Sequence, residues 1–334
     1  MKYHAARYRI WLQKAKSFGA FVVILLLLPY VVTVFVHGAD WQEGIQQEWY
    51  VRVMQPQPVG TKESMVTEIP WETYFIGLLA LESEENSEAE LLKAQAVLIR
   101  TRLYQQMKED PQMVLSERYL SIEEMEKRWG GQEFKTIYEN LKRAMKETEN
   151  QVLYYGENYA WAPYHQSSNG MTRSAEEVLG TDAYPYLTVL ECPCDKEAQE
   201  EIRTCSYSYE EIQTKCQPFL VAVEKEEAEK IYRFEDFEIL SYDAAGYVKE
   251  LRIGKTICTG DQFRDALGLA SSDFSLQEQE GKLRITTTGN GHGMGMSQWT
   301  ANEMAKEGRS YEEILQFFFA GTELRDGGEV RQKI

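Results

Sequence analysis

The hydrophobic pattern of the chain begins with one long apolar run. From Phe18 to Val36 none of the 19 residues is charged, and at about 1.5 Å of helix each they nearly cross a hydrocarbon core of about 30 Å. Five Lys and Arg residues precede the run, which favours a cytoplasmic N-terminus. The pattern predicts a cytoplasmic basic tail at 1–17, a transmembrane anchor at 18–37 and a linker at 38–62. A cleaved signal peptide is the alternative, although its apolar core is usually only about 7–15 residues long.

Helical periodicity follows the predicted linker. Pro70, placed where a first helical turn would begin, predicts a helix that runs to about Leu81. The run Ser87-Glu88-Ala89-Glu90 has the form of a capping box. A second helix is therefore expected from about Glu88 to Met107, with an apolar stripe along one face. Residues 109–150 are charged but keep a helical pattern, so we interpret them as a solvated helical insertion.

Short strands are expected further along the chain. Apolar and aromatic segments predict them at 152–155, 160–165, 237–240, 248–253 and 283–288. Residues 195–235 are acidic and helical in pattern, and helices are expected near 298–307 and 311–319. The fold class is therefore predicted as α+β. It comprises a single-pass N-terminal transmembrane helix followed by a mixed helix and strand extracytoplasmic domain at 63–325, with helical insertions near 109–150 and 195–235.

Charge narrows the choice of partner. The chain carries a net charge of −17, and its first 17 residues contribute +5, so the body that follows the apolar run carries −22. Such a body repels nucleic acid and other anionic polymers. A neutral or cationic partner, or a sugar held by local contacts, fits better. The mean hydropathy of −0.47 suits a soluble ectodomain.

Cysteines are concentrated in one segment. Cys192, Cys194, Cys205 and Cys216 fall within 25 residues, and Cys258 follows alone. Disulfides are permitted outside the membrane. The spacing lacks the paired C-x2-C of a zinc ribbon. Local disulfides, a structural zinc site and free thiols all remain open, and none of these cysteines has a catalytic pattern.

One stretch with chemical potential surrounds the end of the first predicted helix. Glu82 lies at that helix terminus, where a carboxyl group can reach a cleft. In the next helix Lys93 and Arg100 are seven residues apart, which puts them two turns apart on one face. Gln95 lies on a neighbouring line of the same helix. A solvated basic face is the simpler interpretation, but the polar groups are embedded among small and apolar residues that pack.

Two further stretches combine histidine with short polar residues or glycine. His165 ends a predicted strand and leads into a turn rich in hydroxyl groups, as in a sugar site. Around His292, the run 289–299 places four glycines at alternate positions, which lets the backbone approach a ligand or take positive φ. A buried histidine in a tight turn is the simpler interpretation. The run is neither a phosphate-binding loop nor a dinucleotide fingerprint, and with four histidines a histidine-rich metal site is not expected.

Together these stretches resemble the stage II sporulation protein D family of peptidoglycan lytic transglycosylases. The resemblance spans about 63–325 and rests on motifs in a fixed order: Gly77-Leu-Leu-Ala-Leu-Glu82, Leu92-Lys-Ala-Gln-Ala-x3-Arg100, His165-Gln-Ser-Ser-Asn-Gly-Met-Thr172, Pro185-Tyr186-Leu187, Gly260-Asp-Gln-Phe-Arg-Asp-Ala-Leu-Gly-Leu269, Gly291-His-Gly-Met-Gly-Met-Ser-Gln298 and Phe319-Ala-Gly-Thr-Glu-Leu324. The sequence departs from the family pattern after Glu82, where Ser83-Glu84-Glu85 replaces a common proline.

The resemblance implies a catalytic acid at Glu82 and a substrate cleft lined by motif residues. The residues expected to bind substrate are Lys93, Gln95, Arg100, His165, Ser167, Ser168, Thr172, Tyr186, His292, Ser297 and Gln298. We expect no cofactor and no metal. A lytic transglycosylase can work with one carboxylate, whose pKa must be raised by burial or by acidic neighbours such as Glu84 and Glu85.

The resemblance also implies a biological setting. The expected substrate is the glycan strand of peptidoglycan, freed of its peptides by a partner amidase, during engulfment in sporulation. Other sporulation membrane proteins are expected partners, and the expected location is the cell membrane with the body outside. Two alternatives remain: a non-catalytic module that binds the cell wall or activates an amidase, and a scaffold for other wall enzymes.

Overall fold

The computed structural model describes residues 49–54, 65–198, 201–220, 231–328 and 330. The predicted tail at 1–17 and anchor at 18–37 lie outside these residues. The chain divides into the units Met1–Tyr50 and Val51–Ile334, and the description below concerns the second. In the described ranges, no helix combines the length and the apolar character needed to span a membrane.

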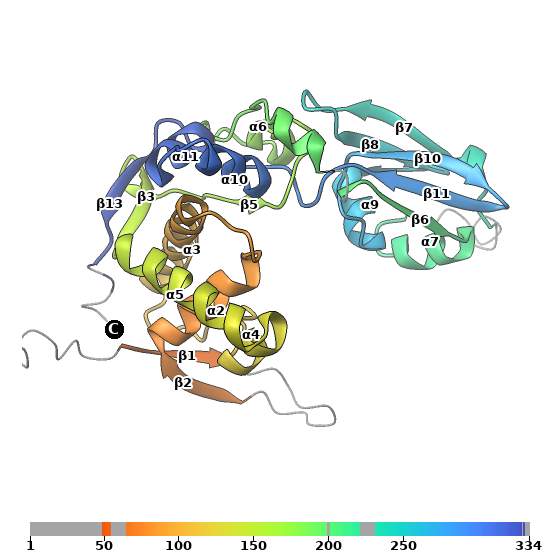
Figure 1. Cartoon of the computed structure of the whole chain (residues 1–334). Coiled ribbons are helices and arrows are strands. Elements are labelled where there is room, and N and C mark those ends of the chain that lie inside the picture. The colour runs from red at the N-terminus through yellow and green to blue at the C-terminus, as the bar shows by residue number, and fades with distance from the viewer. Residues whose placement is uncertain (1–48, 55–64, 199–200, 221–230, 329, 331–334) are drawn as a thin grey trace, which may run out of the picture. The chain divides into compact units, whose positions relative to one another are not determined.

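Four helices form the first part of this unit (Figure 1). They are α2 (Trp71–Glu82), α3 (Ala89–Glu109), α4 (Ile122–Trp129) and α5 (Gly131–Glu147). Two short strands, β1 (Tyr50–Met54) and β2 (Val66–Pro70), pair just before them, and β1 lies inside the segment predicted as linker. The two helices predicted from periodicity are confirmed as α2 and α3. The long helix α3 contacts α2, α5, α10 and α11, and therefore forms the centre of this part.

The predicted start of α3 was wrong in its capping. Its N-cap is Glu88, which makes no side-chain capping bond. The Ser87 hydroxyl instead accepts a hydrogen bond from the Glu84 amide at 3.0 Å, within the turn after α2. The Glu88 amide donates to Asn302 Oδ1 at 2.8 Å. A tertiary contact thus satisfies a free amide that the local sequence could have satisfied alone.

The segment 109–150 is helical as predicted, but it is not a solvated insertion. Ser121 and Glu124 form a full capping box at the start of α4. Met125 and Trp129 in α4 and Leu141 in α5 are buried. Both helices pack against α2, and α5 also packs along α3. The charges therefore occupy the outer face of amphipathic helices whose inner face belongs to the core.

Small sheets and further helices complete this part, and of these helices α10 and α11 pack against α3. One sheet has the order β13–β3–β4, and β5 pairs with β12 in parallel. The elements are β3 (Gln151–Tyr155), β4 (Asn158–Tyr159), β5 (Tyr164–His165), α6 (Ala175–Leu179), η1 (Pro193–Glu197), β12 (Met296–Ser297), α10 (Gln298–Lys306), α11 (Tyr311–Phe318) and β13 (Glu323–Asp326). The strand predicted over 160–165 is confined to its last two residues. The two closing helices are confirmed as α10 and α11.

A second hydrophobic core forms between two three-stranded antiparallel sheets and the helices α7 and α9. Its elements are β6 (Arg203–Tyr207), α7 (Tyr209–Cys216), η3 (Phe234–Asp236), β7 (Phe237–Tyr242), β8 (Val248–Ile253), β9 (Thr256–Thr259), α9 (Gly260–Leu267), β10 (Phe274–Gln279) and β11 (Lys282–Thr287). Figure 1 shows α7 and α9 beside these sheets. The predicted strands at 237–240, 248–253 and 283–288 are confirmed. The purely helical prediction for 195–235 was wrong, because β6 lies within it.

The cysteines pack as apolar side chains. All five are free thiols, and Cys192, Cys216 and Cys258 are buried. Cys192 belongs to the core around α3, whereas Cys216, Cys258 and the partly buried Cys205 belong to the core around α9. Burial raises the pKa of Cys192 to about 12. Within the described residues no cluster of three metal-ligating side chains occurs.

Candidate active-site cleft

Glu82 is the last residue of α2 and opens into a cleft. The cleft is lined by Glu82, Glu84, Asn86, Ser87, Leu91, Gln95, Gln166, Gln298, Trp299, Asn302, Glu303 and Lys306. These residues come from the end of α2, the following turn, the start of α3, the segment after β5 and the length of α10. Chain segments more than 200 residues apart therefore build one site around a single helix terminus.

The carboxyl group of Glu82 is poised to hold a proton. Burial is the main cause that raises its pKa, and the charge of Glu117 adds to this effect. The charge of Arg102 and a side-chain hydrogen bond from Gln298 act in the opposite direction. The net pKa is above the ordinary value of a glutamate. The predicted direction is therefore confirmed, but the main cause is burial rather than the adjacent acids Glu84 and Glu85.

Arg102, Glu117 and Tyr164 form a polar cluster next to Glu82. The Arg102 guanidinium forms an ion pair with Glu117 at 2.6 Å and lies over the Tyr164 ring, 5.9 Å from its centroid. Burial raises the pKa of Tyr164 to about 12, so its hydroxyl stays protonated. Because Glu117 neutralises part of the arginine charge, Arg102 can stay near Glu82 without forcing it to ionise. The motif comparison did not single out any of these three residues.

Arg128 binds the backbone at the end of α2. From the last turn of α4, its Nη1 donates to the carbonyl of Ala80 at 3.1 Å, and its Nη2 donates to that of Ser83 at 3.1 Å. The buried Ser83 hydroxyl donates to the Leu79 carbonyl at 2.6 Å. A cation at the carboxyl end of a helix satisfies free carbonyls and complements the helix dipole. Arg128 thereby fixes the backbone that carries Glu82.

Lys93 and Arg100 are not brought to the cleft. Lys93 forms ion pairs with Glu90 at 2.7 Å and with Glu147 at 2.8 Å. Arg100 is only 2% exposed. Its guanidinium donates to the carbonyls of Thr148, Gln151 and Met145 at 2.7, 3.1 and 3.2 Å. These contacts bind α3 to the end of α5 and to β3, so the position of neither residue supports the predicted substrate contact.

Other predicted residues fall into two groups. Gln95 and Gln298 line the cleft beside Glu82, and the Gln95 side-chain amide lies 3.5 Å from the Glu82 carbonyl. By contrast, the hydroxyl groups of Thr172 and Tyr186 donate to the carbonyls of Thr188 and Trp161 at 2.9 and 3.1 Å. Their positions indicate a supporting role, while Gln95 and Gln298 stay predicted substrate ligands.

Ser167, Ser168 and Ser297 lie behind the cleft wall. The Ser167 hydroxyl is buried without a hydrogen-bond partner among the described residues. Ser168 and Ser297 donate to the buried carboxylate of Asp195. None of the three serines lines the cleft. Their predicted contact with substrate is therefore not supported by their positions.

The glycine-rich loop is held tightly by its surroundings. All four glycines from Gly289 to Gly295 have positive φ, between 71° and 119°. The predicted positive φ is therefore confirmed, and a Cβ on Gly295 would lie 1.9 Å from the Pro163 carbonyl oxygen, so this glycine approaches the protein's own backbone. His165 Nδ1 lies 3.1 Å from the Met294 carbonyl, and the His165 and His292 rings are 5.8 Å apart. Burial lowers the pKa of His165 to about 4 and that of His292 to about 3, so both rings are neutral at neutral pH.

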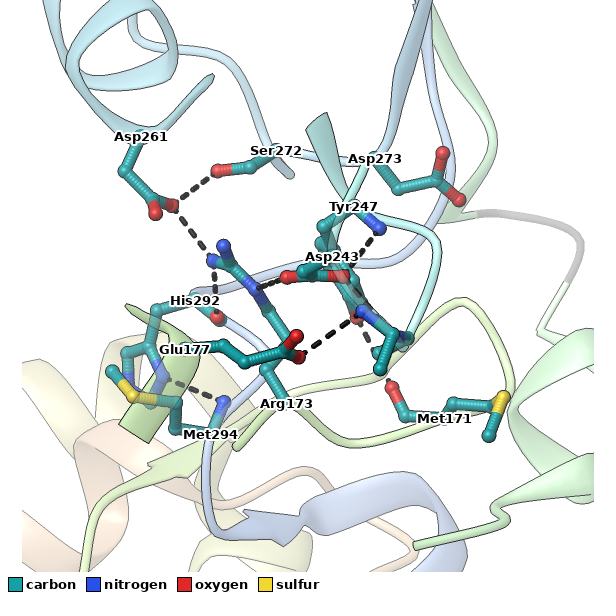
Figure 2. A network of polar contacts seen from close by, with 12 residues as sticks. Met171, Arg173, Glu177, Asp243, Tyr247, Asp261, Ser272, Asp273, His292 and Met294 are labelled. Carbon is teal, nitrogen blue, oxygen red and sulfur yellow. Dashed lines mark hydrogen bonds and ion pairs between the residues drawn. The ribbon is translucent and has the colours of Figure 1, made fainter. Parts of the chain in front are cut away.

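A buried ionic network secures the same loop (Figure 2). Arg173 Nε pairs with Asp243 at 2.7 Å, and its Nη1 pairs with Asp261 at 2.9 Å and donates to the His292 carbonyl at 3.2 Å. The Arg173 amide also donates to the Gly293 carbonyl at 2.7 Å. The guanidinium lies 4.8 Å from the centre of the Tyr247 ring. His165 and His292 do not line the cleft described above, and their predicted contact with substrate is not supported by this arrangement.

Comparison with known proteins finds relatives of one name. Residues 59–155 match the model of the family described as stage II sporulation protein. The chain is 28% identical to stage II sporulation protein D of Bacillus subtilis strain 168, over 94% of this chain and 96% of that protein. It is also 28% identical to stage II sporulation protein D of Bacillus amyloliquefaciens, over 82% and 79% of the two chains. These matches confirm the resemblance to the stage II sporulation protein D family that the motifs predicted.

A shorter match has a different name. Over 54 residues the chain is 41% identical to an amidase enhancer of Bacillus subtilis. The match covers 16% of this chain and 8% of that protein. It therefore concerns a local segment and not the whole architecture.

Proposed function

We propose that this protein cleaves the glycan strands of peptidoglycan as a lytic transglycosylase, with Glu82 as its acid and base. The observation that carries the proposal is a partly buried glutamate with a raised pKa at the end of α2, in a polar cleft. A general acid must hold its proton at the working pH, and burial provides this. Amide and carboxylate side chains along the cleft are suited to hydrogen bonds with sugar hydroxyl groups.

A single carboxyl group can serve both steps of this reaction. Glu82 first donates its proton to the glycosidic oxygen, and the bond between that oxygen and the anomeric carbon of N-acetylmuramic acid breaks. The C6 hydroxyl group of the same sugar attacks the anomeric carbon and transfers its proton to Glu82. The product is a 1,6-anhydro sugar, no water is consumed, and Glu82 regains its starting state. Hydrolytic glycosidases usually need a second carboxylate to activate water.

The neighbours of Glu82 fit this cycle. Glu82 is anionic between the two proton transfers, and Arg102 and Gln298 stabilise the anion. Burial and Glu117 favour the protonated form. The site therefore balances both forms, as a group that gives and then takes a proton requires.

The names of the relatives support a place in sporulation. We propose that the chain is anchored at 18–37 and works outside the cytoplasmic membrane. Its substrate would be glycan strands from which a partner amidase has removed the peptides, during wall remodelling in engulfment. Other sporulation membrane proteins would be its neighbours.

The test is to incubate the purified chain with glycan strands free of peptides and to analyse the products by mass spectrometry. The wild type should give anhydro-muramic ends, and Glu82→Gln should give none. Glu84→Gln serves as a matched control, because this exposed acid also lines the cleft but has no role in proton transfer. Equal activity of Glu82→Gln and the wild type would reject the proposed mechanism.

A second candidate function rests on the match to the amidase enhancer. In that case the cleft would bind the wall without cutting it and would present it to an amidase. The Glu82→Gln variant would then bind glycan strands and stimulate a partner amidase as well as the wild type does, and neither would release anhydro ends. Retained binding without cleavage by the wild type would favour this alternative.

A further inference from the structure

Asp195 is a buried carboxylate outside the cleft that the proposed reaction does not use. It lies in the short helix η1 and is 3% exposed. Its Oδ2 accepts hydrogen bonds from the amide and hydroxyl groups of Ser168 at 2.6 and 2.5 Å. Its Oδ1 accepts from the hydroxyl groups of Ser297 and Thr300 at 2.8 and 2.6 Å. These four neutral donors compensate the burial of the Asp195 carboxylate.

These donors belong to two separate walls of the cleft. Ser168 follows Gln166, which lines the cleft after β5. Ser297 is the N-cap of α10, and its hydroxyl accepts a hydrogen bond from the Thr300 amide at 3.3 Å. The next residue, Gln298, makes the side-chain hydrogen bond to Glu82. Asp195 is thus two contacts away from the proposed acid, through the first turn of α10.

A second set of bonds joins the same two walls. The Trp299 amide donates to the Gln166 carbonyl at 2.9 Å, and the Gln166 side chain donates to Glu84 at 3.0 Å. The Gln166 side chain also accepts from Asn290 of the glycine-rich loop at 2.8 Å. A displacement at Asp195 would therefore reach the cleft by way of both Gln166 and Gln298.

We propose that Asp195 is a positioning residue: it clamps the turn at Ser168 to the N-terminus of α10 and so holds Gln298 in hydrogen-bond contact with Glu82. This inference deepens the proposed function and rests on Glu82 being the acid. A single hydroxyl group could cap α10, but it could not accept bonds from Ser168, Ser297 and Thr300 at the same time. A carboxylate can, because its two oxygens accept four bonds at once.

The test compares Asp195→Asn, Gln298→Ala and the control Glu197→Gln in the full-length protein. Asparagine keeps the size of the side chain but replaces one carboxylate oxygen with an NH2 group, which is a donor. This group either faces the Ser168 amide, which is also a donor, or replaces the oxygen that accepts from Ser297 and Thr300. Glu197 is an exposed acid in the same short helix η1. Glu197→Gln therefore removes one negative charge from this helix, as Asp195→Asn does, but leaves the bonds of Asp195 intact. The readouts are the NMR titration of the Glu82 carboxyl group, kcat and KM on peptide-free glycan strands, and thermal unfolding.

The expected result has three parts. Loss of the Gln298 contact removes a bond to the ionised form of Glu82, so its titration should move to higher pH in both Asp195→Asn and Gln298→Ala. In the double variant that combines Asp195→Asn with Gln298→Ala, Glu82 should titrate no higher than in Gln298→Ala alone, because both changes remove the same contact. For Asp195→Asn, kcat should fall by roughly tenfold to a hundredfold with a smaller change in KM, as for a misplaced reacting group. Glu197→Gln should match the wild type throughout.

The opposite result would overturn the inference. If Asp195→Asn lowers the unfolding temperature but leaves the titration of Glu82 and the ratio of kcat to KM unchanged, Asp195 only stabilises the fold. If Asp195→Asn does not fold, Thr300→Val decides in the same way, since it removes one donor and keeps the side-chain shape. A wild type that cleaves no glycan would reject the proposed function, whereas the NMR titration would still report whether Asp195 controls the contact with Glu82.

Discussion

The buried Arg100 allows the clearest separation of a structural role from a substrate-binding role. Arg100→Met keeps the length of the side chain and its packing against Phe75, whose ring centroid lies 4.8 Å from the guanidinium. It removes the bonds to three backbone carbonyls and one hydroxyl group. A hydrogen bond to a charged group is worth about 1.5–3 kcal/mol, and a buried group left unsatisfied costs a similar amount. Allowing for relaxation, the expected loss is about 3–5 kcal/mol of unfolding free energy.

Thermal unfolding measures this loss. At about 2–4 °C per kcal/mol for a domain of this size class, the unfolding temperature should fall by roughly 6–20 °C. At a temperature where the variant is folded, its kcat and KM should equal those of the wild type. Lys93→Met is the matched control, because its two ion pairs are partly exposed and worth at most about 1 kcal/mol each. A variant with unchanged unfolding temperature but no activity would refute this reasoning and restore Arg100 as a substrate ligand.

Three further predictions follow from the site. Arg102→Met removes a charge that favours ionised Glu82, so the loss of activity at alkaline pH should move to higher pH. Glu117→Gln removes a charge that favours protonated Glu82 and should move this loss to lower pH. The pH–rate profiles of the two variants measure both shifts. Arg128→Ala should lower kcat roughly tenfold by loosening the end of α2, and Arg128→Lys should recover part of it in steady-state assays. Since the pKa of His165 falls from 6.5 to about 4 on folding, this ring should contribute about 3 kcal/mol to the drop in unfolding free energy between pH 6.5 and 4, and denaturant titrations should find the drop smaller by about that amount in His165→Gln.

Controls make these predictions specific. Lys127→Ala alters the neighbouring cation of α4, whose partner is the exposed Glu123, and should leave activity unchanged. Arg102→Met and Glu117→Gln must shift the alkaline limb of the pH–rate profile in opposite directions. Equal shifts would show that these two residues do not act on Glu82 through their charge. An unchanged slope of stability against acid pH in the histidine variant would contradict the burial of a neutral ring.

The periodic parts of the fold were accessible from the sequence, and the non-periodic parts were not. The helices α2, α3, α10 and α11 and the strand β8 have a regular apolar pattern, which predicts them closely. Strand β6 is an edge strand with no buried residue, so it has no alternation of apolar residues to detect. Asp195 binds groups 27 to 105 residues away along the chain, and no local pattern records such contacts.

Arg102, and not Arg100, is the α3 arginine that lies near Glu82. The two arginines are two residues apart on α3, which turns their side chains roughly 200° from each other around the helix axis. Arg100 stands among small and apolar residues, and that setting suggested a functional group protected from solvent. The same setting buries it in the core against Phe75 and the end of α5. Arg102 faces Glu82 instead, and only the fold reveals which side of the helix meets the cleft.

The most direct test of the central claim follows the fate of oxygen during cleavage. The purified chain is incubated with peptide-free glycan strands in water enriched in heavy oxygen, and the new ends are analysed by mass spectrometry. Intramolecular attack by the C6 hydroxyl group predicts anhydro ends that carry no heavy oxygen and do not form with Glu82→Gln. New ends that incorporate heavy oxygen from water would contradict a single-carboxylate lytic mechanism and would require a second base in the cleft.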